Sequence, residues 1–261
     1  MIYFAYSAET ASLNIAQALR GFLGLEERED FHGLKCFGGN GILMLEVGGR
    51  LINADFLDAF VDAPLIFLSR HSSSMGIPAF TVHAEGNWSS EASLGGRPKM
   101  LSVSSPVGML KALRTIKAIN NTDLDVTYEA THHGPLINSP SFFVELGGNE
   151  DVINNAEHAK LLADAVARSI DADAGYGKIA VGFGGMHYPR KFTALALDCK
   201  YAFSHIMSKH HIGNTDMIEH AFARSDIPAE IAVIEWKGIK SAEREVIIRE
   251  LARLGIDYAK V

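Results

Sequence analysis

The sequence of 261 residues predicts an α/β fold in which a mixed, largely parallel sheet is flanked by helices. Short apolar runs alternate along the chain with segments whose apolar positions repeat at helical spacing. The run at residues 64–69 is almost entirely apolar, as is typical of a strand covered on both faces. No internal repeat or domain boundary is evident, so residues 1–261 are predicted to form one domain.

Each element expected in the first half has a local reason. Residues 2–6 form an apolar run, and a helix from residue 9 places its apolar positions on one face and ends at Gly24. The charged segment 26–30 is expected to be a solvated loop. Strands are expected at residues 41–47, 64–69 and 79–82, and Pro106 begins a helix that extends to residue 119. The Gly-, Ser- and Pro-rich residues 86–105 indicate a long functional loop.

The second half continues the alternation. Residues 126–128 and 141–146 have β-branched and aromatic side chains that suit strands. Residues 150–170 are expected to form one helix, because an acidic start suits the positive end of the helix dipole. Strands at 178–183, 201–207 and 231–236 alternate with helices at 215–224 and 241–254.

Composition limits the classes of function. With 24 basic and 31 acidic side chains, the net charge of −7 argues against a protein that coats DNA or RNA non-specifically. This net charge is still compatible with a local basic patch that binds a single RNA end. Cys36 and Cys199 are too few for a disulfide framework, and no apolar run is long enough to cross a membrane. The N-terminus lacks the features of a signal peptide, so a cytoplasmic location is expected.

The stretch 126–135 concentrates reactive groups where a strand ends. Glu129, Thr131, His132 and His133 lie within five residues, before Gly134 and a proline break the chain. Adjacent residues of a strand face opposite ways, so both histidines serve one site only if the strand has ended. The simpler alternative is a turn in which one histidine caps backbone groups and the other is solvated.

Histidines also follow three other expected strands, as His71, His83 and His187. If the strands are parallel, their carboxyl ends lie together and the histidines converge on one crevice. Such a crevice suits zinc, or a general base with polar neighbours that orient it. No compact zinc motif is present, and separate loop histidines remain the alternative.

Other motifs give weaker signals. Backbone amides of Gly184 and Gly185 would suit a phosphate or an oxyanion, although glycine after a strand is usually a tight turn. No dinucleotide-binding, Walker or Gly-x-Ser-x-Gly motif is present. Basic residues and two aromatic residues are candidates for contact with RNA, or else solvated charges and core packing: Arg97, Lys99, Lys111, Arg114, Lys117, Arg190, Lys191, Trp88 and Tyr188.

Taken together, the segments 2–12, 69–73, 81–87, 129–135 and 184–188 make the chain resemble the archaeal and plant type of D-aminoacyl-tRNA deacylase. The resemblance implies a monomeric, cytoplasmic, zinc-dependent hydrolase that cleaves the ester between a D-amino acid and the 3′ acceptor end of tRNA. It also implies a core related to peptidyl-tRNA hydrolases and nucleoside phosphorylases.

The residues that match these segments receive hypothetical roles. His132 or His133 would act as the base, with Glu129 or Glu85 orienting it and Thr131 beside it. Zinc would be held by His83, His187 and Glu85. Substrate would be bound by Arg70, His71, Ser72, Gly184, Gly185 and Tyr188. Two alternatives remain: a small-molecule hydrolase or nucleoside phosphorylase-like enzyme that uses the same crevice, and a non-catalytic module that binds the tRNA end.

Overall fold

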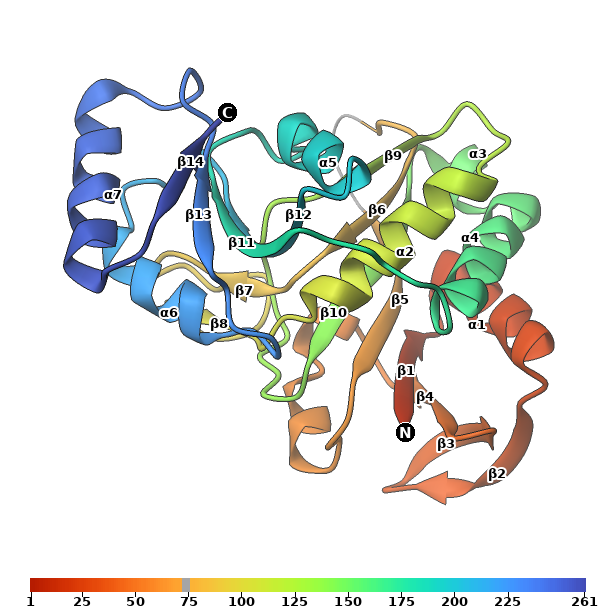
Figure 1. The fold of residues 1–261 in the computed structure, drawn as a ribbon. Coiled ribbons are helices and arrows are strands. Elements are labelled where there is room, and N and C mark those ends of the chain that lie inside the picture. The colour runs from red at the N-terminus through yellow and green to blue at the C-terminus, as the bar shows by residue number, and fades with distance from the viewer. Residues whose placement is uncertain (72–75) are drawn as a thin grey trace.

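The computed structural model describes residues 1–71 and 76–261 and contains two main sheets (Figure 1). The larger sheet has eight strands, and the smaller has four parallel strands. A short pair, β7 (Gly86–Asn87) and β8 (Met100–Leu101), lies apart from both. This arrangement confirms the predicted fold class of a mixed, largely parallel sheet with flanking helices.

The larger sheet is parallel at its centre and mixed at both sides. Strands β4, β1, β5 and β10 run parallel to one another, whereas β6 runs antiparallel to β10 and parallel to β9. The strand order is β2 (Glu26–Phe31), β3 (Leu34–Gly39), β4 (Ile42–Val47), β1 (Ile2–Ser7), β5 (Leu65–His71), β10 (Ser141–Gly147), β6 (Ala79–His83) and β9 (Asp125–Tyr128).

Three helices cover one face of this sheet: α1 (Thr10–Leu23), α2 (Pro106–Ile119) and α4 (Ala156–Ser169). Alternate residues of a strand point to one face, and Phe142, Val144 and Leu146 of β10 enter the core beneath these helices. On the opposite face, Phe143 packs against short turns of 3₁₀-helix, η1 (Leu51–Asn53) and η2 (Asp55–Ala59). Glu145 shares that second face, which no α-helix of the described residues covers at this point.

The smaller sheet, ordered β12 (Tyr201–Met207), β11 (Lys178–Phe183), β13 (Ile231–Ile234) and β14 (Tyr258–Lys260), contains the C-terminal part of the chain. Figure 1 shows it beside α2, with α6 (Ile218–Ala223) and α7 (Ser241–Leu254) on its far side. Helix α5 (Arg190–Leu197) contacts β9 and β12, and so joins the two sheets. The remaining short elements are α3 (Glu150–Ile153) and η3 (Thr215–Met217).

Three expectations from the sequence were wrong. The charged segment 26–30 is not a loop but the exposed edge strand β2, because charged side chains are compatible with a strand that has solvent on one side. The single helix expected at 150–170 is interrupted at Asn154 and Asn155, where the Asn155 side chain caps the start of α4. The strands that carry His71 and His83 are not parallel, because β6 opposes β10.

Candidate functional site

The segment 129–134 leaves β9 and crosses from the larger sheet to the smaller one. The Glu129 amide donates to the Val82 carbonyl of β6, and the Thr131 amide donates to the Ile206 carbonyl of β12. His133 has a positive φ of 45°, so the strand has ended before the two histidines. This backbone path permits His132 and His133 to face the same site.

Residues from β5, β10 and β6 complete the site on one face of the sheet. Glu145 stands opposite Ser69 and Thr81, and His83 stands opposite Phe143, two residues before Glu145. His71 follows Ser69 by two positions, so His71, Glu145 and His83 point to the same side. The histidines therefore meet across a sheet face and not, as predicted, at the shared carboxyl ends of parallel strands.

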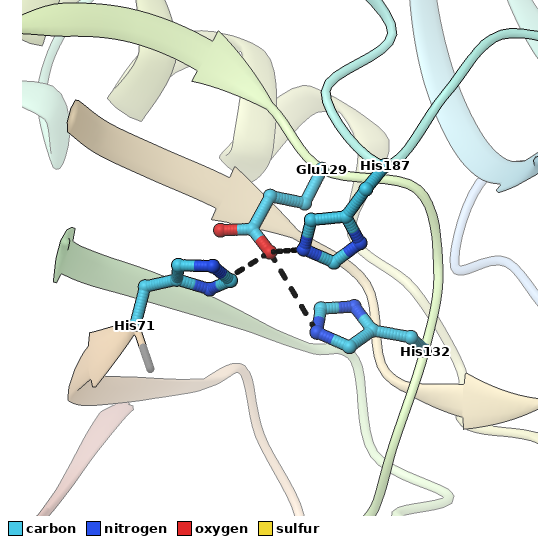
Figure 2. Close-up of side chains that lie close together, drawn as sticks. All are labelled: His71, Glu129, His132 and His187. Atoms are coloured by element: carbon cyan, nitrogen blue, oxygen red, sulfur yellow. Dashed lines mark ion pairs between the residues drawn. The ribbon is translucent and has the colours of Figure 1, made fainter. Parts of the chain in front are cut away.

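Three imidazoles converge on one carboxylate oxygen (Figure 2). The Oε2 atom of Glu129 lies 2.8 Å from His187 Nε2, 3.1 Å from His71 Nδ1 and 3.6 Å from His132 Nε2. The carboxylate is fully buried, while His187 is partly open to solvent. An anionic oxygen surrounded by nitrogen atoms requires shared protons or a bound cation to be stable.

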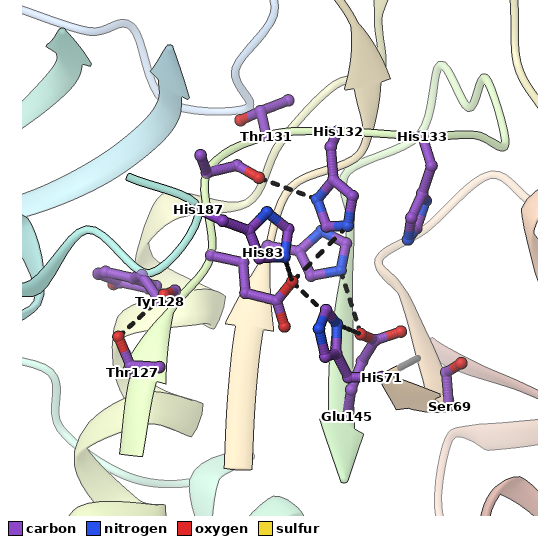
Figure 3. Close-up of polar contacts among 12 residues, drawn as sticks. Ser69, His71, His83, Thr127, Tyr128, Thr131, His132, His133, Glu145 and His187 are labelled. Carbon is purple, nitrogen blue, oxygen red and sulfur yellow. Dashed lines mark hydrogen bonds and ion pairs between the residues drawn. The ribbon is translucent and has the colours of Figure 1, made fainter. Parts of the chain in front are cut away.

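A second buried carboxylate, Glu145, adjoins the first (Figure 3). Its Oε2 atom lies 3.3 Å from His71 Nδ1 and 3.6 Å from His83 Nε2. His71 thus bridges Glu129 and Glu145, and the two carboxylates with their histidines form a single network.

Backbone carbonyls fix the orientation of three of the rings. His83 Nδ1 contacts the Ala84 carbonyl at 3.1 Å, His132 Nδ1 contacts the Ala130 carbonyl at 2.9 Å, and His133 Nδ1 contacts the Gly134 carbonyl. A carbonyl oxygen only accepts, so each Nδ1 carries the proton. When these rings are neutral, their Nε2 atoms keep a lone pair, which is the arrangement that metal-binding and basic histidines need.

The pKa values follow from burial and from this network. Burial raises the pKa of a carboxyl group, but contacts with His187 and His71 outweigh it and hold the pKa of Glu129 well below its usual range. Contacts with His71 and His83 likewise overcome burial and lower the pKa of Glu145 to about 2. Both carboxylates are therefore ionised at neutral pH.

The histidines divide into two groups. Burial lowers the pKa of His71, but its bonds to Glu129 and Glu145 dominate and raise it to about 10. The pKa of His83 is also raised, because its contact with Glu145 outweighs burial. Burial together with neighbouring imidazoles lowers the pKa of His133 to about 4 and that of His132 well below its usual value. His132 and His133 are therefore neutral at pH 7.

Several of these residues are placed to hold a metal ion. The ligand atoms of His71, Glu129, His132 and His187 all lie within 4.8 Å of one another. Two overlapping sets, one of His83, His132 and His133 and one of His83, Glu129 and Glu145, meet the same condition. Neutral imidazole and carboxylate are ligands that zinc takes in proteins.

The cluster opens onto a cleft of about 390 Å³. His71, His132, His133, His187 and Glu145 line its floor. Its rim includes Glu9, Arg50, Leu51, Ile52, Ser69, Arg70 and Leu94. A polar cleft above buried carboxylates and neutral imidazoles is suited to proton transfer on a bound molecule.

Two residues with predicted roles lie outside the cluster. Glu85 is fully buried, accepts a hydrogen bond from Ser141 Oγ, and belongs to none of the three possible metal-binding sets. Thr131 turns its hydroxyl toward β12, where it accepts from the Ile206 amide and contacts His205 Nδ1 at 3.3 Å. The structure brings neither side chain to the two carboxylates.

The predicted substrate-binding residues have varied positions. Arg70 lines the cleft and pairs with Glu9 at 3.4 Å. The Tyr188 ring lies 5.7 Å from that of His71, and Ser72 is outside the described residues. The Gly184 amide donates a hydrogen bond to the Met207 carbonyl, and a Cβ atom on Gly185 would contact Pro189. These glycines therefore serve the tight turn that leads to His187.

Most of the basic residues considered for RNA contact are partnered. Lys99 pairs with Asp216, Arg190 with Asp125 and Lys191 with Glu235. In the stripe on α2, Lys111 and Arg114 reach backbone carbonyls after α4. Trp88 is buried and donates to the Thr131 carbonyl, so it packs in the core and offers no open stacking surface.

The sequence analysis did not identify Glu145 as a functional residue. The sequence feature that could have identified it is a single acidic residue in a strand whose other residues are apolar or small. A carboxylate buried in such a strand is unstable unless it is paired, so the residue indicates a paired, functional carboxylate. Its partners come from β5 and β6, which lie far away along the chain, so only the sheet register shows that it is paired.

Comparison with known proteins identifies the family of this chain. The profile of the D-aminoacyl-tRNA deacylase family matches residues 61–259. The D-aminoacyl-tRNA deacylase of Pyrococcus abyssi is 33% identical, over 97% of this chain and 96% of its own. That of Methanoregula boonei is 42% identical, over 69% of this chain and 40% of its own. The crystal structure of a conserved protein of unknown function, 30% identical, superimposes with a TM-score of 0.91 over 100% of this chain and 95% of its own. The chain belongs to the D-aminoacyl-tRNA deacylase family.

Proposed function

We propose that the cluster around Glu129 and Glu145 is the active site at which this protein, a D-aminoacyl-tRNA deacylase, hydrolyses its substrate. The reaction adds water across the ester and releases a free D-amino acid and tRNA, which removes wrongly charged tRNA before translation. The observation that carries the assignment is the convergence of His71, His132 and His187 on one buried oxygen of Glu129.

We further propose that the cluster binds zinc, with His71, Glu129, His132 and His187 as the donor set. The chemistry of these donors supports it, because His132 Nε2 keeps a lone pair yet faces the ionised Glu129 at 3.6 Å. Bound zinc supplies a Lewis acid that polarises an ester carbonyl and makes water more acidic. Of the ligands first considered, only His187 is kept in this proposal, and Glu85 and His83 are replaced by Glu129, His71 and His132.

The general base in this proposal is His133. It lines the cleft, and the contact of its Nδ1 with the Gly134 carbonyl leaves the Nε2 lone pair available to accept a proton. The proton taken from the attacking water is then returned to the ribose oxygen as the ester breaks. His71, which is protonated in the metal-free cluster, would give up that proton on binding zinc, and it carries no proton-transfer step of its own.

Membership of the family supports a proposal for the substrate and the setting. The proposed partner is the 3′ acceptor end of a D-aminoacyl-tRNA, on which the protein works as a cytoplasmic monomer. Within the described residues, none of the helices is long and apolar enough to cross a membrane.

The test compares hydrolysis of D-Tyr-tRNA and L-Tyr-tRNA by the purified protein, with metal content measured before and after chelation. Rapid loss of only the D-ester, its arrest on chelation and its recovery with zinc are expected. Spontaneous ester hydrolysis in buffer is the control. Hydrolysis that does not distinguish the D-ester from the L-ester would refute the proposed function. D-specific hydrolysis that survives complete metal removal would refute only the zinc proposal.

A further inference from the structure

Two hollows meet at His132 and His133. One is the cleft of about 390 Å³ above the carboxylates, and the other is a smaller pocket of about 210 Å³. Leu94 lines both hollows and has 49% of its surface exposed. The smaller pocket is lined by Gly86, Asn87, Trp88, Ser89, Glu91, Ser93, Leu94, His132, His133 and His211.

Tight backbone packing fixes Leu94 between the two hollows. The Gly134 amide donates to the Leu94 carbonyl at 3.0 Å. A Cβ atom on Gly95 would lie 1.8 Å from the Ile52 carbonyl oxygen, and one on Gly134 would lie 2.1 Å from the Gly96 nitrogen. Such contacts leave no space for a side chain at either glycine, so three backbone segments fix the position of the Leu94 backbone between the two hollows.

The two hollows differ in the charged groups that line them. The larger cleft carries Arg50 and Arg70 together with the carboxylates of Glu9 and Glu145. Arg70 is already paired with Glu9, but within residues 1–71 and 76–261 Arg50 makes no ion pair. An exposed guanidinium at the rim suits a phosphate group, to which arginine donates two hydrogen bonds.

The smaller pocket carries one carboxylate, Glu91, and neither lysine nor arginine among its lining residues. The Ser93 hydroxyl donates to Glu91 Oε1 at 3.0 Å, and this orients the carboxylate at the mouth of the pocket. Burial and the neighbouring His210 lower the pKa of His211, so its ring is neutral at pH 7 and leaves the charge of Glu91 uncompensated. A carboxylate beside hydroxyl groups suits an ammonium ion.

From this arrangement we propose that Leu94 separates the binding positions of the two halves of the substrate. The smaller pocket takes the D-aminoacyl group, with its α-ammonium on Glu91, and the larger cleft takes the terminal nucleotide, with a phosphate on Arg50. The inference rests on the proposed function and adds its specificity-determining residues. With the ester carbonyl at the histidines and the ammonium at Glu91, D and L side chains must point in different directions. Leu94 is the wall that the L side chain strikes.

The first test measures kcat/KM for D-Tyr-tRNA and L-Tyr-tRNA in three variants. Leu94→Ala is expected to raise kcat/KM for the L-ester about tenfold or more, because the L side chain no longer collides with Leu94. The kcat/KM for the D-ester should change little. Leu94→Met, which keeps the volume, should retain discrimination. Val246→Ala on α7, a similarly exposed apolar residue, is the control. Unchanged discrimination in a folded Leu94→Ala protein would overturn the role of Leu94.

The second test separates the two halves by using D-Tyr-tRNA and the phosphate-free 3′-D-tyrosyl-adenosine. Glu91→Gln should lower kcat/KM about tenfold on both substrates, and the loss should vanish when the α-amine is acetylated. Arg50→Ala should weaken only the tRNA substrate, with a reduced salt dependence. Glu29→Gln, on exposed β2, is the matched control. The reverse pattern, with Arg50→Ala impairing both substrates and Glu91→Gln neither, would overturn the assignment. Inactivity of the unaltered protein would instead refute the proposed function.

Discussion

His83 Nε2 lies 3.6 Å from Glu145 Oε2, across the antiparallel pair of β6 and β10. The Nδ1 atom of this imidazole is engaged by the Ala84 carbonyl. Unless a proton or a cation lies between them, a nitrogen lone pair therefore faces an ionised oxygen. This contact makes Glu145 as central to the cluster as Glu129, although it lies on a strand otherwise built for the core.

We therefore expect Glu145→Gln to reduce zinc affinity and kcat/KM about 10- to 100-fold, because a buried negative charge that stabilises the cluster is removed. The measurement is metal content after dialysis against a buffered chelator, together with D-Tyr-tRNA hydrolysis.

Glu85→Gln is the matched control, since both glutamates are fully buried. Burial raises the pKa of Glu85 to about 7, so an amide resembles its protonated form and still accepts from Ser141. Little change is expected. If Glu85→Gln releases the metal and Glu145→Gln does not, the prediction that Glu145 supports the metal site is wrong.

His132 and His133 are expected to differ in function although they are adjacent. His132 Nε2 faces Glu129 within the proposed donor set, whereas His133 belongs only to the overlapping set with His83 and His132 and has a pKa of about 4. His132→Gln should lose zinc. His133→Gln should keep zinc but lower kcat at least about 100-fold, as expected for loss of a general base. Both variants are compared by zinc stoichiometry and single-turnover hydrolysis. Equal loss of zinc in the two variants would remove the distinction.

A third prediction concerns stability and pH. Burial lowers the pKa of His205 to about 4, and its neutral form fits its contacts: Nε2 donates to the Arg224 carbonyl and Nδ1 accepts from Thr131. An unfolded histidine has a pKa of about 6.5, so between pH 6.5 and 4 the unfolded state binds the extra proton. The contribution of His205 to stability therefore falls as the pH falls through this window, by about 3 kcal/mol.

Urea unfolding at several pH values between 7.5 and 4.5 measures this effect. His205→Gln is expected to be less stable at pH 7 but to lose less stability on acidification, and the difference between the two slopes isolates His205. His158→Gln provides the control, since that histidine is partly open on α4. Parallel slopes for the unaltered protein and His205→Gln would contradict a neutral buried His205.

The sequence predicted the elements and the motif histidines well, because both depend on local patterns. The strand at 64–69 and the helix that ends at Gly24 lie where periodicity places them, and Gly24 adopts the left-handed cap. The edge strand β2 was missed because its residues are nearly all charged and show no alternation of apolar and polar side chains.

The pairing of residues was not predictable, since it depends on register between distant strands. His71, His83 and His187 were identified, but the reason given for their meeting assumed parallel strands. Thr131 shares the motif with His132, yet the path of the backbone turns its hydroxyl to the other sheet. Proximity along the chain gave no information on side-chain direction here.

The last prediction concerns the packing that holds Leu94. Gly95 has a φ of +83°, and a Cβ there would overlap the Ile52 carbonyl oxygen at 1.8 Å. Gly41 has a similar φ of +75°, but nothing lies within 4 Å of its missing Cβ. Alanine at either position carries the same backbone strain, about 1 kcal/mol. Only Gly95→Ala must also displace the loop that carries Leu94.

Thermal unfolding and hydrolysis of both tyrosyl-tRNA esters are measured for the two variants. Gly41→Ala should be slightly destabilised with unchanged kcat/KM and D/L selectivity. Gly95→Ala should lose activity toward the D-ester well beyond its loss of stability, because the displaced segment changes the shape of the two hollows beside His132 and His133. Equal activity in the two variants would mean that the close approach of Gly95 to Ile52 does not control the site, and that Leu94 is positioned by its own side-chain contacts.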